Sequence, residues 1–169
     1  MDFQSCGAIF DITATYRYSL WRVWSAAAPR VVFVMLNPST ADAQYNDPTI
    51  RRCIDFASTW GFGSVEVVNL FAYRTVHPTQ LRQVDDPIGA DNNLFLVQAV
   101  QRAARIVVAW GTHGTLLDRD REVLELLKRG HTCYCFGLTK DGHPKHPLYV
   151  RGDTRLVTYT LAASFQLQN

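Results

Sequence analysis

Polar side chains suited to chemistry recur where apolar runs of this sequence end. Asn37 directly follows the apolar run 31–36, and Asn69 closes a second run. An asparagine amide carries a donor and an acceptor on one planar group, which suits a bound water or the edge of a nucleobase. His143 and His146 lie in a later loop, and imidazole can donate a hydrogen bond or transfer a proton. These types predict a polar site if folding brings the three segments together.

A parallel sheet would bring them together. Residues 31–36 are apolar at every position, which is typical of a strand buried on both faces, and Pro38 cannot donate to a ladder, so the strand ends there. Strands are also predicted at 65–69, 105–110 and 132–136, and helices at 47–60, 88–103 and 116–128. This alternation predicts an α/β fold with three layers, α/β/α, around a central four-stranded, mostly parallel sheet. A β-hairpin at 8–12 and 16–24 precedes it.

Two further expectations concern the helices. Asp47 suits the N-cap of the first helix and Pro48 suits its first turn. The spacing of apolar residues places two groups against the sheet, with Gly130 ending the last helix. These groups are Leu94, Val97, Val100 and Ala104, and then Leu117, Val123, Leu124 and Leu127.

Length and composition indicate one domain spanning residues 1–169. Apolar residues make up 47% of the chain and charged residues 19%, which excludes wholesale disorder. The longest apolar run is far shorter than the ~20 residues of a membrane helix, and no secretory signal opens the chain, so we predict a cytoplasmic protein. No C-x-x-C pair occurs, so the cysteines are expected to be reduced core residues, with no metal site and no cofactor. They are Cys6, Cys53, Cys133 and Cys135.

Four segments resemble the uracil-DNA glycosylase superfamily, over about residues 31–150. Residues 32–39 (VFVMLNPS) are similar to the water-activating motif of its mismatch-specific branch. Residues 65–70 resemble the strand whose terminal asparagine reads a flipped base, and 105–111 the strand and glycine before the last helix. Residues 143–148 (HPKHPL) resemble the second catalytic motif, H-P-S-P-L. The resemblance therefore implies a base-flipping glycosylase fold.

The resemblance also implies residue roles. Asn37 would orient the attacking water, and Asn69 would read the base edge. One histidine would donate to a base carbonyl oxygen as charge develops, and the extra residue in the motif leaves both His143 and His146 as candidates. The other residues expected to contact substrate are Pro38, Ser39, Thr40, Tyr45 and Phe71.

Charged residues near these motifs supply candidates for phosphate binding and proton transfer. Arg51 and Arg52 lie in the first turn of the predicted helix, where backbone N–H groups also favour an anion. Lys140 and Lys145 lie beside the histidines. The nearest carboxylates are candidates for the base if Asn37 does not activate the water, and they are Asp42, Asp47 and Asp55.

A second resemblance covers the chain as a whole. Residues 36–42 (LNPSTAD), followed by residues 47–49 (DPT), are similar to a family of bacterial and phage proteins known only as a domain of unknown function. That family implies no activity.

We therefore predict a hydrolase of nucleobase N-glycosidic bonds, as in DNA repair or modification. Its partner would be nucleic acid, DNA more than RNA, or a nucleotide. Leu148 and Tyr149 offer an apolar wedge for base flipping, which favours nucleic acid. The alternative is a non-catalytic module that recognises nucleic acid or nucleotides on the same fold. Met35 and Ser39 favour it, since they stand where such glycosylases have glycine. The sequence assigns no oligomeric state.

Overall fold

The computed structural model describes residues 1–127 and 131–160. The strands in these residues are β1 (Ser5–Phe10), β2 (Arg17–Val23), β3 (Arg30–Met35), β4 (Ser64–Asn69), β5 (Arg105–Val108), β6 (Cys133–Cys135) and β7 (Val157–Thr158). The α-helices are α1 (Pro48–Thr59), α2 (Asn92–Gln101) and α3 (Arg119–Leu127). Three 3-10 segments connect them: η1 (Pro78–Arg82), η2 (Gly111–Asp118) and η3 (Pro147–Tyr149).

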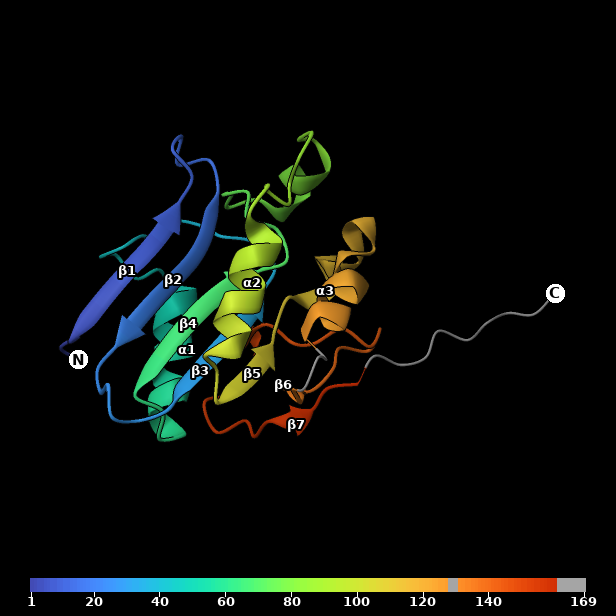
Figure 1. Cartoon of the computed structure of the whole chain (residues 1–169). Coiled ribbons are helices and arrows are strands. Elements are labelled where there is room, and N and C mark those ends of the chain that lie inside the picture. Colours follow the sequence, from blue (N-terminus) through green and yellow to red (C-terminus); the bar gives the residue numbers. More distant parts are fainter. Residues whose placement is uncertain (128–130, 161–169) are drawn as a thin grey trace.

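The strands form one mixed sheet in the order β1-β2-β4-β3-β5-β6-β7 (Figure 1). The neighbours β4, β3, β5 and β6 run parallel, which confirms the predicted parallel core. The sheet is larger than the four strands predicted for it and has seven. β2 pairs antiparallel with β4, and β7 pairs antiparallel with β6, so the hairpin extends the central sheet. Pairing covers edges that the core would otherwise leave open, and the pattern within a hairpin does not specify its partner.

Helices cover both faces of the sheet, which explains why the core strands are apolar without alternation. On one face Val32, Val34 and Val108 pack with residues of α2 and α3. On the other, Phe33 and Val67 pack with residues of α1. In Figure 1, α2 and α3 lie in front of the sheet and α1 lies behind it.

The first helix begins as predicted. The side chain of Asp47 accepts a hydrogen bond from the Ile50 backbone N–H at 2.9 Å, and Pro48 follows in the first helical position. This N-cap satisfies a donor that the helix itself leaves unpaired. The structure therefore confirms both residues at the start of α1.

The predicted inward faces of the later helices are partly wrong. In α2 the buried residues include Leu96, Ala99 and Val100, whereas Leu94 is 54% exposed. The helix begins at Asn92 rather than 88, which leaves the earlier residues outside its periodicity. Leu117 is also exposed, because it lies at a kink with a φ of 57° before α3 begins. Val123, Leu124 and Leu127 are buried as expected, and the predicted stop at Gly130 falls outside the described residues.

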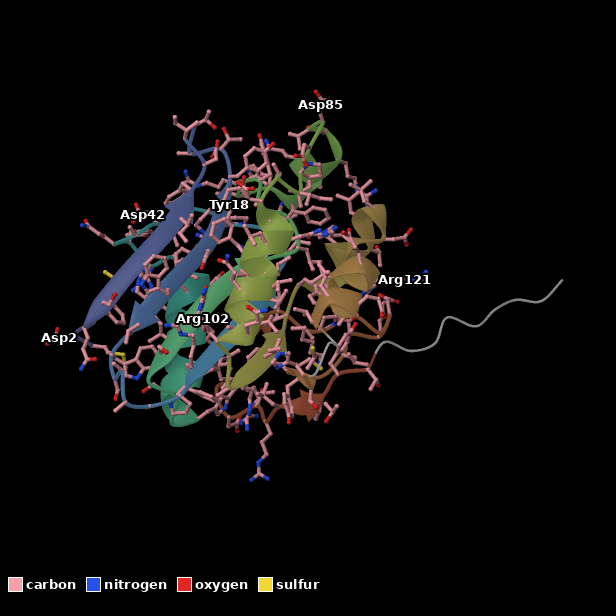
Figure 2. All side chains as sticks on the ribbon, viewed as in Figure 1. Asp2, Tyr18, Asp42, Asp85, Arg102 and Arg121 are labelled. Atoms are coloured by element: carbon pink, nitrogen blue, oxygen red, sulfur yellow. The ribbon has the colours of Figure 1, made fainter. Side chains whose placement is uncertain are left out.

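A buried carboxylate joins β4 to neighbouring elements. Glu66 is 2% exposed and accepts a hydrogen bond from the Ser19 hydroxyl at 2.9 Å. Its two oxygens also form ion pairs with Arg30 at 2.8 Å and Arg102 at 2.9 Å. Arg102 directly follows α2, at the end of that helix remote from Asn92 (Figure 2). Pairing of this kind is what makes a buried charge tolerable.

Candidate functional site

A cavity of about 380 Å³ lies at the carboxyl ends of the parallel strands. Open α/β sheets bind ligands at this edge. The lining includes segments that follow β3 and β5, the last residue of β4, the start of α1 and the loop around η3. Its polar side chains include those of Asn37, Ser39, Asp47, Asn69, Trp110 and His146. The structure thus brings together the three segments on which the sequence prediction rests.

Asn37 is fixed at this edge by its own amide. Its Nδ2 donates to the carbonyl oxygens of Thr75 at 2.7 Å and Pro38 at 2.9 Å. The carbonyl of Pro38 also accepts from the Thr75 backbone N–H at 2.9 Å, which ties the two segments together. Since both Nδ2 hydrogens are engaged, Oδ1 is the group left to accept a hydrogen bond from a ligand or water.

The backbone carbonyl of Asn69 accepts a hydrogen bond, whereas its side-chain Nδ2 has no partner among the described residues. The residue is 1% exposed. Its carbonyl oxygen accepts from Asn92 Nδ2 at 3.0 Å, and the next carbonyl, of Leu70, accepts from Asn92 at 2.9 Å and from Arg119 Nε at 2.8 Å. Residues of α2 and α3 therefore position this strand end, while the amide remains able to bind.

His146 lines the cavity and His143 does not. The Leu148 backbone N–H donates to His146 Nδ1 at 3.3 Å, so a neutral ring carries its proton on Nε2. Burial lowers the pKa of His146 to about 4, against the opposing effect of Asp47. At neutral pH the site therefore holds an uncharged imidazole with one N–H donor. His143 instead belongs to a turn in which its backbone N–H donates to the Thr139 hydroxyl at 3.2 Å.

Asp47 is the only carboxylate lining the cavity among the described residues. It is 5% exposed, and besides capping α1 it accepts from the Ala41 backbone N–H at 3.4 Å. Asp42 and Asp55 do not line the cavity. Of the three carboxylates that lie near Asn37 in the sequence, Asp47 is therefore the one placed to act as a base in the cavity.

Two arginines of β2 hold the loop between β3 and α1. Arg17 Nη1 donates to the Ala41 carbonyl oxygen at 2.8 Å. Arg22 Nη2 donates to the carbonyl oxygens of Asp42 at 2.7 Å and Tyr45 at 3.2 Å. Asp42 lies beside the hairpin in Figure 2. Arg17 also lines the cavity, and burial lowers its pKa to about 10, opposed by Asp47, so it stays charged at neutral pH.

The predicted substrate contacts divide between the cavity and other places. Ser39 lines the cavity, and Thr40 lines an adjoining groove. Pro38 is buried, but its ring is not part of the lining. Tyr45 is 52% exposed and lies outside the cavity, and Phe71 is fully buried in the core.

None of the predicted phosphate-binding residues lines the cavity. Arg52 Nη2 donates to the Val150 carbonyl oxygen at 2.7 Å, and its guanidinium lies 4.7 Å from the ring centre of Phe56, so it anchors the loop around η3. Arg51, Lys140 and Lys145 are exposed.

Sequence reasoning missed several lining residues. Arg17 and Trp110 line the cavity, as does Thr75 from the long connection after β4. The available signal for Arg17 was an arginine at the start of a strand that is rich in apolar and aromatic residues, although Arg22 in the same strand carries the same signal and does not line the cavity. Tyr149 is 84% exposed at the lining, with its ring centre 5.6 Å from that of His146.

Other predictions concern metals, cysteines and membranes. No group of three or more His, Cys, Asp or Glu side chains within residues 1–127 and 131–160 is arranged to hold a metal ion. All four cysteines are free thiols, three of them buried as expected and Cys6 exposed. Within the same residues, the helices are too short or too polar to span a bilayer.

Comparison with protein families gives one match. The family model described as "Protein of unknown function (DUF1643)" matches residues 17–148. Comparison with curated proteins and with solved structures gives no match. The matched range begins at Arg17 and ends at residue 148, so it includes every residue that lines the cavity except Tyr149.

Proposed function

The chain belongs to the DUF1643 family, whose function is unknown, so the family suggests no activity. From the residues of the site, we propose that the protein hydrolyses a nucleobase N-glycosidic bond, in nucleic acid or in a nucleotide. The observation that carries the proposal is the meeting of Asn37, Asn69 and His146 around one cavity. These residues match the motifs that resemble the uracil-DNA glycosylase superfamily.

Each of these side chains has a part suited to the reaction. Water held by Asn37 Oδ1 would attack C1′ of the sugar, while Asn69 binds the base through its free amide. The C1′–N bond breaks, its electron pair stays on the base, and the water oxygen forms the new bond to C1′. His146 donates a hydrogen bond from Nε2–H to the base as negative charge develops, and it keeps its proton. One water proton leaves, and Asp47 is the carboxylate available to accept it.

The test is release of free bases, measured by mass spectrometry. A panel of modified and mismatched oligonucleotides and of nucleotides is incubated with wild type, Asn37→Ala and His146→Ala. His143→Ala is the matched control, because that histidine lies outside the cavity. We expect the first two variants to lose on the order of 10²–10³ in rate and the control to retain it. Equal activity of Asn37→Ala and wild type would refute the proposal.

A non-catalytic recognition module is the second candidate. Met35 and Ser39 both line the cavity, and a side chain larger than glycine at these positions favours binding without close approach to a sugar. Salt-dependent binding of oligonucleotides without release of any base would support this alternative.

A further inference from the structure

One buried arginine side chain has hydrogen-bond donors that are largely without partners. Arg17, Arg22 and Arg119 are each at most 2% exposed. Arg22 donates from all three nitrogens, to Asn46 Oδ1 and to backbone carbonyls. Arg119 likewise bonds the Leu70 carbonyl and the Asn93 side chain and forms an ion pair with a glutamate.

Arg17 differs from both. Its guanidinium makes one hydrogen bond, from Nη1 to the Ala41 carbonyl, and neither Nε nor Nη2 has a partner among the described residues. No ion pair joins it to a carboxylate in that part of the chain, although the nearby charge of Asp47 opposes part of the effect of burial. Burial of an incompletely paired charge is costly, so proteins normally supply a partner. Arg17 lines the cavity, where a ligand can be that partner.

We propose that Arg17 binds negative charge on the ligand, and that in the reaction it stabilises the departing nucleobase as an anion. This chemistry rests on the proposed glycosidic activity. Bond cleavage leaves an electron pair that spreads over the ring nitrogens and oxo groups of the base. Neutral His146 supplies a donor but no full charge. Arg17 is the only arginine or lysine lining the cavity among the described residues, and its buried position leaves its charge weakly screened.

The test compares bases that differ in charge and little in shape. At pH 8, 5-nitrouracil and xanthine are largely anionic, whereas uracil and hypoxanthine are largely neutral. Binding of all four is measured by isothermal titration calorimetry. We expect wild type to bind the anionic member of at least one pair about tenfold to a hundredfold more tightly, the range for a hydrogen bond to a charged group.

Three variants assign that preference to Arg17. Arg17→Gln should abolish it, and Arg17→Lys, which keeps the charge without the planar fork, should give an intermediate preference. Arg51→Gln removes an exposed charge outside the cavity and should leave the preference intact. Far-UV circular dichroism checks that each variant folds. If Arg17→Gln does not fold, the test is the comparison of Arg17→Lys with wild type, in which the preference for the anionic base should be smaller for Arg17→Lys.

Lack of any preference in wild type, or its retention without Arg17, would overturn the inference. The outcome is separable from the proposed function. Base release without preference for an anion leaves the glycosidic activity standing and removes Arg17 from it. Preference for an anion without base release from any substrate supports Arg17 as the anion-binding residue of a recognition module.

Discussion

Burial of His146 predicts a specific dependence of stability on pH. Its pKa falls from 6.5 to about 4 on folding. Above pH 6.5 the imidazole is neutral in both folded and unfolded chains, so it contributes nothing. Between pH 6.5 and 4 the unfolded chain binds a proton that the folded chain excludes, so stability decreases as pH falls. At 1.36 kcal/mol per pKa unit the full loss is about 3 kcal/mol, and about 2 kcal/mol is already lost at pH 5.

The measurement is urea unfolding followed by tryptophan fluorescence, from pH 7.5 to pH 4.5. His146→Gln cannot bind the proton, so its free energy of unfolding should fall by about 2 kcal/mol less than that of wild type between pH 7.5 and pH 5. His143→Gln is the control, because it removes a nearby histidine outside the cavity. If His146→Gln and wild type lose stability in parallel, the argument from burial is refuted.

Three further predictions test the packing around the site by urea unfolding. Leu96→Ala should lower the free energy of unfolding by about 2–5 kcal/mol, because it leaves a cavity at a fully buried position of α2. Leu94→Ala, on the exposed side of the same helix, should lower it by about 0.5 kcal/mol or less, and equal losses would contradict the observed helix face. Glu66→Gln should cost about 1–3 kcal/mol through loss of two ion pairs. The cost should be smaller in 1 M salt, because salt screens the ion pair with Arg102, which is the more exposed of the two arginines. Asn92→Ala should cost about 1–3 kcal/mol by removing hydrogen bonds to two carbonyls at the end of β4, and it should weaken ligand binding; unchanged binding would separate Asn69 from the site.

Local chemistry explains which parts of the fold were predictable. The continuous apolar run 31–36 predicted a strand buried on both faces, and Asp47-Pro48 predicted the start of a helix. Each signal depends on neighbouring residues alone. Leu117 was placed inward from its spacing, but its backbone leaves the helical conformation, which spacing does not report.

The site was predictable only as a set of segments. Strand-end positions drew attention to Asn37 and Asn69, and both line the cavity. Two histidines three residues apart in one loop were equivalent by sequence, and only tertiary contacts place His146 at the lining and His143 outside it. The sequence predicts that Arg52 binds phosphate, whereas in the structure its guanidinium donates a hydrogen bond to the Val150 carbonyl oxygen.

The sequence by itself determined the alternation of strands and helices, the polar residues at strand ends, and the family to which the chain belongs. Tertiary structure decided that β2 would lie beside β4, and this pairing brings Arg17 from the amino-terminal hairpin to the cavity. The physical reason is range. Helix caps and strand patterns arise from interactions between near neighbours, whereas the partner of an edge strand and of a buried charge depends on residues distant in sequence.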